Sequence, residues 1–257
     1  MPREGGAGGV KSAVRVFEIL ELFDQVRIPL TVSDIARELD YPVSSALMLL
    51  RCMQDQGYLT LDEHRKTYMP TPRLSRITGW VDYSATGVKD LNGMLEDLQR
   101  STGETIVLAA QQGIDAVFLR ILRSHQPVSL AVQEGSWATL EESSVGLAIL
   151  SAKTDGELDA LLARINKDPE RALSLSARQD LLKRVAKVRA KGVSCGYGYM
   201  SPDTGGIAAP LPVGPSGVLY VISVGGPKDR IKSREKEIVA ALKDAVVQIE
   251  KQRDAAA

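Results

Sequence analysis

A short helix, a tight turn, a second helix and a hairpin follow one another within residues 30–70, and this order constrains the fold most strongly. Thr31 precedes Asp34 by the spacing of a capping box, which predicts that a short helix begins here. The turn signal Asp40-Tyr41-Pro42 separates this helix from a second one, predicted over residues 43–56. Two helices in this order, joined by so short a turn, are typical of a helix-turn-helix.

The hairpin is predicted from two apolar runs, Tyr58–Leu61 and Thr67–Met69, which flank the charged residues 62–66. Together with the two helices before it, the hairpin predicts a winged helix-turn-helix domain. We place this domain at residues 11–78 and expect the Gly-rich residues 1–10 to form a flexible arm.

The first helix of this domain is predicted from an apolar stripe. Val14, Phe17 and Leu20 recur at helical spacing, and Ser12 is the expected N-cap. We therefore expect this stripe to face the core of the domain.

A change of pattern follows over residues 79–100, where four apolar residues recur every three or four positions: Val88, Leu91, Leu95 and Leu98. Gly103 is a suitable stop. This segment is predicted to be an amphipathic connector helix between two domains.

Residues 101–252 alternate between short strands and helices, a pattern typical of an α+β domain with a mainly antiparallel sheet. A capping box at Ser176 and Gln179 is expected for one of its helices. The expected strands are 105–110, 116–122, 128–132, 206–210 and 218–224, and the expected helices are 143–151, 155–164, 176–191 and a last one with Ile238, Leu242, Ala245 and Ile249 on one face.

Charge alone does not indicate a nucleic-acid ligand, since 32 basic residues balance 32 acidic ones. Residues 1–78 are also neutral, with ten of each kind. Their positive charge gathers in the arm and the hairpin region, whereas most of the acidic residues lie within 16–40. Neutrality therefore predicts a modest non-specific affinity for DNA and does not exclude DNA binding.

The chain is expected to be cytoplasmic and without a membrane partner. It lacks an apolar run of about 18 residues, and its N-terminus lacks the apolar core of a signal peptide. Cys52 and Cys195 are too far apart in sequence to indicate a disulfide framework or a metal site. No metal and no cofactor are expected.

Catalytic residues are scarce. His64 lies in the predicted hairpin tip and His125 in a predicted loop, and no motif pairs a nucleophile with a base. We therefore expect a protein that is not an enzyme, although an enzyme built on the C-terminal domain remains one alternative.

The second helix of the helix-turn-helix offers a candidate DNA-binding face. Ala46, Leu49, Leu50 and Met53 are predicted to face the core, so that Arg51 points outward, where it can hydrogen-bond a guanine or a phosphate. A winged helix that contacts only proteins is the second alternative. The candidate DNA-binding residues are Lys11, Arg15, Thr31, Ser44, Ser45, Leu47, Met48, Arg51, Arg65 and Lys66.

A Gly/Tyr-rich segment is the candidate ligand-binding element of the C-terminal domain. Tyr197 and Tyr199 supply ring faces and hydroxyl groups, and the glycines at 196, 198, 205 and 206 permit tight backbone turns. A surface loop without a ligand is the alternative.

Several segments resemble IclR-type transcriptional regulators in the order typical of that family. They are LTVSDIARELDYPVSSALMLLRCMQDQGYL (30–59), LQRSTGETIVLAAQQG (98–113), VQEGS (132–136), SSVG (143–146), IAAP (207–210) and VISVGGP (221–227). The resemblance covers about residues 10–250.

This resemblance implies a bacterial regulator of a catabolic operon, a repressor or an activator, that binds a double-stranded DNA operator and a small organic effector. It implies a winged helix joined to a GAF-like effector domain, and homodimers that often assemble into homotetramers. The effector-binding positions that it implies are Val132, Trp137, Ser143, Ser144, Gly146, Tyr197, Tyr199, Gly206 and Ser223.

The chain departs from the family pattern at some of these places. Met48 replaces a frequent arginine of the recognition helix, Glu141-Glu142-Ser143 replaces a His-Ala-Thr stretch, and Gly206 replaces a frequent cysteine. Two acids near the pocket would repel an anion if they faced it. We therefore expect an aromatic or hydroxylated effector.

Overall fold

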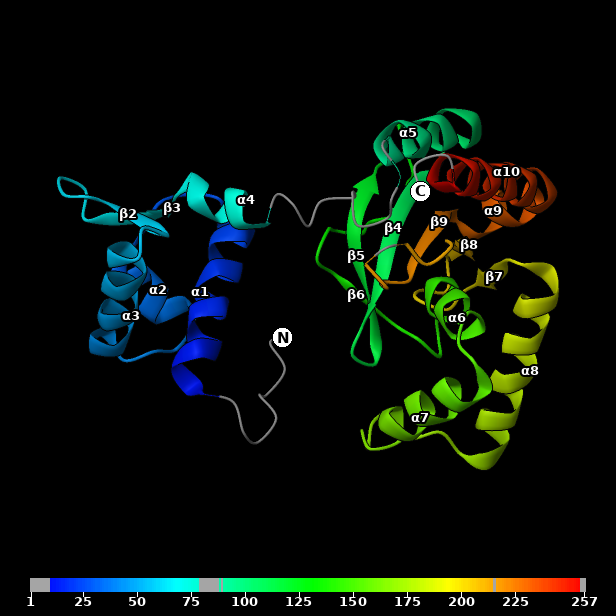
Figure 1. Cartoon of the computed structure of the whole chain (residues 1–257), viewed down its shortest axis with the longest axis horizontal. Coiled ribbons are helices and arrows are strands. Elements are labelled where there is room, and N and C mark those ends of the chain that lie inside the picture. The colour runs from blue at the N-terminus through cyan, green and yellow to red at the C-terminus, as the bar shows by residue number, and fades with distance from the viewer. Residues whose placement is uncertain (1–9, 79–87, 89, 215, 255–257) are drawn as a thin grey trace. The chain divides into compact units, whose positions relative to one another are not determined.

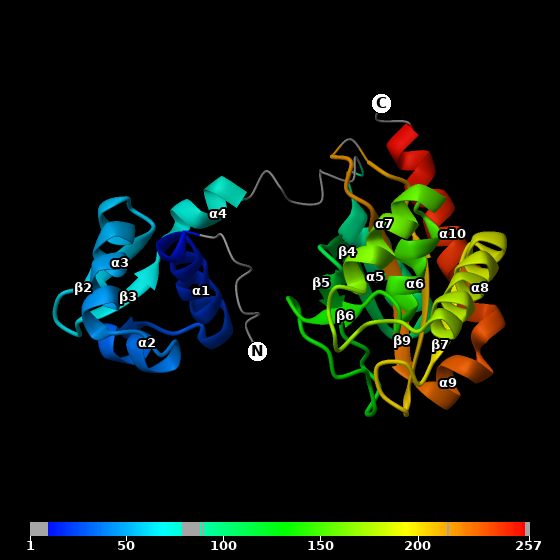
Figure 2. The same ribbon diagram turned by 90° about the horizontal axis from the view of Figure 1, so that it is seen from below.

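The structure, a computed structural model, describes residues 10–78, 88, 90–214 and 216–254 and divides into two compact units, Met1–Asp82 and Tyr83–Ala257 (Figures 1 and 2). The predicted arm up to residue 9 and residues 79–87 and 89 of the predicted connector lie outside the described residues. Each unit is described separately below.

The N-terminal unit is a winged helix-turn-helix, as predicted. Its small antiparallel sheet has the order β1-β3-β2, and β1 is a strand that the sequence pattern did not predict. The elements are α1 (Lys11–Val26), β1 (Leu30–Thr31), α2 (Val32–Glu38), α3 (Val43–Asp55), β2 (Leu59–Asp62), β3 (Thr67–Pro70) and α4 (Pro72–Thr78).

Helix α1 differs from its prediction in two respects. Its N-cap is Val10, which makes no side-chain cap, so the prediction for Ser12 is wrong. The face toward the core carries Ile19, Leu22 and Phe23, whereas Val14 and Phe17 of the predicted stripe are exposed. The apolar residues of α1 therefore occupy two faces, of which the core of this unit covers one.

The capping box at the start of α2 is confirmed. The backbone N–H of Asp34 donates to Thr31 Oγ1 at 3.2 Å, and the backbone N–H of Thr31 donates to Asp34 Oδ2 at 3.1 Å. The hydrogen bond from the Thr31 hydroxyl and the one from its backbone lower the pKa of the Asp34 carboxyl. The resulting stability is present above the pKa of Asp34 in the unfolded chain and is lost as pH falls through the lowered pKa of the folded state.

The C-terminal unit is built on a six-stranded antiparallel sheet with the order β6-β5-β4-β9-β8-β7, which confirms the predicted α+β class. Its elements are α5 (Leu91–Thr102), β4 (Thr105–Gln112), β5 (Asp115–Leu122), β6 (Trp137–Thr139), α6 (Ser144–Ser151), α7 (Asp155–Ile165), α8 (Leu175–Lys191), β7 (Ser194–Tyr197), β8 (Thr204–Pro210), β9 (Tyr220–Pro227), α9 (Lys228–Ser233) and α10 (Glu235–Asp254).

Helices cover both faces of this sheet (Figure 1). Alternate side chains of β4 enter the two cores: Val107 and Ala109 pack in the core with α6, α7 and α8, whereas Ile106 and Leu108 pack in the core with α5, α9 and α10. A strand buried on both faces reads as a nearly continuous apolar run, which is why the sequence pattern found β4 without indicating its two faces.

The predicted strand at residues 128–132 is absent from this described segment. The carbonyl of Val128 accepts a hydrogen bond from Arg230 Nη2 at 3.0 Å, and the carbonyl of Val132 accepts one from Arg123 Nη2 at 3.0 Å. Arginine side chains thus take the place of strand partners for these backbone groups. The edge strand is instead β6, which pairs with β5.

Two further expectations need correction, and two elements were not expected. Ser174, not Ser176, caps α8, by accepting a hydrogen bond from the N–H of Ala177. Strand β7 and helix α9 were not predicted. The connector pattern yields a helix only from Leu91 within the described residues, and this helix ends at Gly103 in the left-handed conformation.

We predict that Thr31→Ala destabilises the N-terminal unit by about 1 kcal/mol, because an N-cap side chain is lost. Urea unfolding at neutral pH would measure this change. Ser33→Ala is the matched control, since Ser33 is exposed in the same helix and outside the capping box. Equal stability of the two variants would contradict the role of Thr31.

Candidate functional site

Helix α3 presents a face to solvent that carries little charge. Ser44, Met48 and Arg51 are exposed, and Met48 retains 74% of its accessible surface. Ser45 and Leu47 are half-buried, whereas the predicted core face is buried at Ala46, Leu50 and Met53 and half-buried at Leu49. Arg51 is therefore the one cation on the described exposed face of α3.

The hairpin adds two exposed cations at its tip, Arg65 and Lys66. Lys66 Nζ lies 2.8 Å from a Glu63 carboxylate oxygen, and both side chains are about 70% exposed. An exposed ion pair of this kind contributes little free energy, so Lys66 is readily available to another anion.

Arg15 and Tyr41 form a contact between α1 and the turn before α3. The Arg15 guanidinium lies 4.6 Å from the centre of the Tyr41 ring, and the Tyr41 hydroxyl donates to the Glu18 carboxylate. Burial and this hydrogen bond raise the pKa of Tyr41. Arg15 is thus held in place beside the start of α3, whereas Lys11 is exposed at the first turn of α1.

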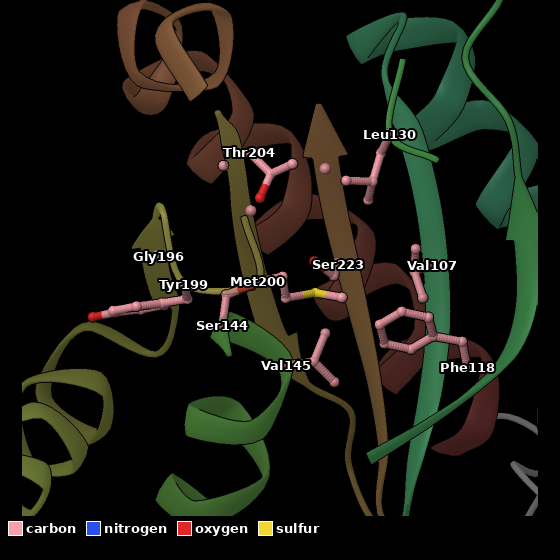
Figure 3. A pocket seen from close by; sticks show the side chains of 13 residues that line it. Val107, Phe118, Leu130, Ser144, Val145, Gly196, Tyr199, Met200, Thr204 and Ser223 are labelled. Atoms are coloured by element: carbon pink, nitrogen blue, oxygen red, sulfur yellow. The ribbon is translucent and has the colours of Figure 1, made fainter. Parts of the chain in front are cut away.

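The C-terminal unit has a hollow between α6, the sheet and the turn after β7, which Figure 3 shows from close by. It contains about 410 Å³ of space free of protein atoms, including space open to solvent. Its lining carries hydroxyl, thioether, aromatic and aliphatic side chains but no charged one: Val107, Phe118, Leu130, Ser144, Val145, Gly196, Tyr199, Met200, Thr204, Gly205, Gly206, Ser223 and Gly225. We call this hollow the pocket.

Two hydroxyl groups meet at the floor of the pocket. A Cβ atom placed on Gly206 would lie 2.7 Å from Ser144 Oγ and 3.7 Å from Ser223 Oγ. The absence of a side chain at Gly206 thus leaves both hydroxyls accessible, with Ser144 in the first turn of α6. This arrangement can accept and donate hydrogen bonds to a small polar group.

Four of the nine predicted effector-binding residues line the pocket: Ser144, Tyr199, Gly206 and Ser223. The other five lie elsewhere. Ser143 is the N-cap of α6, where it accepts from the N–H of Gly146 at 2.9 Å and donates to the carbonyl of Thr139.

Gly146 has a packing role, because a Cβ atom here would collide with the backbone of Leu140. The Tyr197 hydroxyl donates to Glu235 at 2.6 Å, and its ring packs with the core on the opposite face of the sheet from the pocket. Val132 is buried in the pocket-side core, and Trp137 is half-exposed in β6.

Two further lining residues, Gly196 and Gly205, belong to the predicted Gly/Tyr-rich segment, whereas the others were not named as effector-binding positions. Alternation along β4 and β5 could have placed Val107 and Phe118 on a common face. No pattern marks Met200, which enters the pocket from a turn next to Tyr199.

The acid before α6 does not face the pocket. Glu141 is buried and accepts two hydrogen bonds of 2.7 Å from Arg171, whose third one of 2.7 Å goes to Asp115. The Glu141 and Asp115 side chains are 6% and 5% exposed. This buried cluster ties β5 and the segment before α6 to the loop before α8, while Glu142 is exposed.

The described residues show little provision for catalysis. No described cluster of His, Cys, Asp or Glu has an arrangement that could hold a metal ion. His64 and His125 are both exposed, and neither lines the pocket. Among the helices that the structure describes, none is long and apolar enough to cross a membrane.

The chain thus joins a winged helix-turn-helix unit, a fold that suits DNA binding, to a sheet domain with an uncharged pocket that suits a small molecule. Residues 12–63 match the IclR helix-turn-helix domain, and residues 87–251 match the family described as bacterial transcriptional regulator IclR C-terminal. The chain belongs to the IclR family of transcriptional regulators.

Curated relatives of similar length support this membership. The HTH-type transcriptional regulator XynR of Escherichia coli is 22% identical over 88% of this chain and 90% of its own length. The HTH-type transcriptional repressor AllR of the same species is 22% identical over 87% of this chain and 82% of its own length.

Solved structures share the fold. An IclR homologue of Microbacterium hydrocarbonoxydans, complexed with 4-hydroxybenzoate, has a TM-score of 0.76 and 23% identity, and the match covers 95% of this chain and 99% of that one. The IclR of Thermotoga maritima has a TM-score of 0.71 and 20% identity, with the same two coverages.

We predict that Arg171→Met destabilises the C-terminal unit by about 3–5 kcal/mol, because two buried carboxylates lose their partner. Chemical denaturation would measure this loss. Arg178→Met is the control, since its partner Asp159 is 65% exposed and the pair should contribute less than about 1 kcal/mol. A loss no greater than that of the control would contradict the role of the buried cluster.

The next prediction uses a metabolite that is first shown to raise the melting temperature of the wild-type protein. We predict that Gly206→Ala raises the dissociation constant of this metabolite about tenfold or more, since losing one hydrogen bond to a ligand costs about 1.5 kcal/mol. The added Cβ would force the Ser144 hydroxyl away from the pocket floor. Gly156→Ala in α7 is the control, because a Cβ there meets no atom within 4 Å. Unchanged affinity in Gly206→Ala would place the ligand elsewhere.

Proposed function

We propose that this regulator acts in the cytoplasm, binds an operator through residues 11–78 and binds a small organic effector through residues 101–252. The observation that carries the proposal is the combination of an exposed α3 face with a separate uncharged pocket in one chain of the IclR family. Control of a catabolic operon is part of this proposal.

The DNA-binding surface that we propose centres on α3. Ser44 and Ser45 lie in its first turn, where small hydroxyl groups suit contacts with phosphates or base edges. Leu47 and Met48 can contact thymine methyl groups, and Arg51 can hydrogen-bond a guanine. We assign phosphate contacts to Lys11, Arg15, Thr31, Arg65 and Lys66.

Low charge on α3 has a consequence for operator selection. Because Arg51 is the one cation on the exposed face of α3 that the structure describes, this helix gains little non-specific affinity from contacts with phosphates. Shape, positioning of the backbone and dimer geometry should therefore account for a larger share of specificity.

The effector that we propose is aromatic or hydroxylated. Phe118, Val107 and Val145 give the pocket apolar walls that suit a ring, and Ser144 and Ser223 supply hydroxyl groups. The similar protein that binds 4-hydroxybenzoate supports a ligand of this kind. An anion is not repelled by Glu141, because Arg171 neutralises it away from the pocket.

Self-association is supported by the second apolar face of α1. Val14 and Phe17 are exposed on this helix and Val10 is exposed at its N-cap, with Phe17 retaining 64% of its accessible surface. We propose that this face pairs with a second copy of the chain to form a dimer, and that dimers assemble into tetramers. A dimer predicts operator half-sites related by a two-fold axis.

Effector binding must favour one arrangement of the subunits in order to change DNA binding. We propose that the connector at about residues 86–100, which includes most of α5, transmits that preference. In the structure α5 packs in one core with α10 and with β4.

Two alternatives receive less support. An enzyme of this kind would need a nucleophile paired with a base, and no histidine, cysteine or acid lines the pocket. A winged helix that contacts only proteins predicts that no DNA is retarded in the gel shift described below.

The test is a gel shift with full-length protein and the chromosomal region upstream of its own gene. We expect retarded DNA and an affinity that falls steeply with salt, because phosphate contacts release counterions. If Arg51 binds a guanine, Arg51→Ala should reduce the binding free energy by about 1–3 kcal/mol and relax specificity at one base position. An equal loss of affinity for all DNA sequences would indicate a phosphate contact instead.

Arg164→Ala is the control, since it removes an exposed cation from α7 in the other unit. Absent or salt-independent binding by the wild-type protein would contradict the proposed function.

A further inference from the structure

The turn between β7 and β8 contributes two neighbouring residues, Tyr199 and Met200, to the lining of the pocket, and Figure 3 shows their side chains extending in opposite directions. Its backbone is held at its two ends. The N–H of Gly198 donates to the carbonyl of Thr204 at 2.8 Å, and the N–H of Thr204 donates to the carbonyl of Ser201 at 3.0 Å. The two side chains between these bonds are held very differently.

Tyr199 is fixed against the pocket wall. Its ring lies so close to Gly196 that a Cβ atom there would be 2.5 Å from the ring. The Arg184 guanidinium lies over the ring at 5.5 Å from its centre, and its Nη2 donates to the carbonyl of Glu141 at 3.1 Å. The close packing on Gly196 and the guanidinium over the ring together hold the Tyr199 ring in place.

Met200 is held by much less. Figure 3 shows its side chain extending across the pocket, with its end toward Phe118. The residue nevertheless retains 48% of its accessible surface. A methionine has three rotatable side-chain bonds and an apolar thioether, so it can fill an irregular space and leave it again at low cost.

The space that Met200 crosses is the space that a ring-shaped ligand needs. A ligand that hydrogen-bonds to Ser144 and Ser223 and packs on Phe118 would overlap with the Met200 side chain. Such a ligand must move Met200 toward solvent.

We propose that Met200 determines the specificity of the pocket by occupying the place of the ligand until the ligand displaces it. The pocket then selects molecules with an aromatic ring that replaces the Met200 contact with Phe118 and with a hydroxyl group for Ser144 or Ser223. This inference rests on the proposed effector pocket. It adds a residue that competes with the ligand from within the chain.

Competition of this kind has a simple consequence for affinity. The apparent dissociation constant equals the intrinsic one divided by the fraction of time in which the pocket is open. If Met200 fills the pocket about nine-tenths of the time, its removal tightens binding about tenfold.

Phenol is the probe, because it carries one ring and one hydroxyl group and no charge. Its dissociation constant is measured by calorimetry for the full-length wild type, Met200→Ala and Met200→Leu. We expect Met200→Ala to bind about tenfold more tightly, and Met200→Leu, which keeps the volume, to remain within about twofold of the wild type. Leu175→Ala removes an exposed apolar side chain elsewhere and should leave binding unchanged.

A second measurement follows Met200 directly. Full-length protein is labelled with carbon-13 at the methyl groups of its six methionines, and the Met200→Leu spectrum assigns the Met200 signal. We expect this signal to be shifted by the Phe118 ring and to move toward the value of free methionine as phenol saturates the pocket. A signal that starts at the free value would overturn the proposal.

The proposal also fails if Met200→Ala binds phenol no more tightly than the wild type, or if neither protein binds it. Melting temperatures of all variants establish that they are folded. Operator binding, measured on the same samples, separates this failure from failure of the proposed function. If phenol binding fails in one of these ways while the wild type still binds operator DNA, only the role of Met200 is overturned. If the wild type does not bind operator DNA, the proposed function as a regulator is overturned.

Discussion

The close approach of helix α6 to the sheet is the interaction on which the pocket depends. Gly146 allows the helix to touch the backbone of Leu140, and Ser143 caps its first turn. Arg171 then neutralises the buried acids beside this turn, so that Glu141 ties down the segment before the helix and leaves the pocket uncharged. With α6 placed in this way, the hydroxyl of Ser144 reaches the pocket floor. Residues that do not contact the pocket therefore determine its shape and its charge.

The two units handle charge in a similar manner, although their chemistry differs. In the C-terminal unit, buried acids are paired with arginines, as Glu104 is with Arg230 at 2.6 Å, and the pocket is lined by neutral groups. In the N-terminal unit, α3 exposes Arg51 as its cation, while Lys66 is already near a carboxylate. Both recognition surfaces thus depend on shape and hydrogen bonding more than on net charge, which agrees with a chain whose formal charge is zero.

Local patterns predicted from sequence a part of what local interactions determine, although the predicted caps Ser12 and Ser176 were wrong. The capping box of Thr31 and the left-handed stop at Gly103 depend on neighbouring residues and were found. The segment 128–132 was misassigned, since arginine side chains bind two of its carbonyl groups, and one of these, Arg230, is distant in sequence. Tyr197 and Tyr199 would share a face in a continuous strand, but β7 ends at Tyr197 and the turn at Gly198 follows, with φ of 78°. Sequence reasoning assigned four pocket residues as effector-binding positions and named Gly196 and Gly205 beside them, but it could not find Met200, since a turn has no periodicity.

The central claim is that one chain couples an effector pocket to DNA binding. Such coupling is reciprocal, so it can be measured from the effector side. Calorimetric titration of an effector into the full-length protein, with and without saturating operator DNA, tests it most directly. The account predicts that DNA changes the dissociation constant of the effector by about 5- to 150-fold, the same factor by which the effector changes operator affinity. An effector that binds equally well in both titrations would contradict the account.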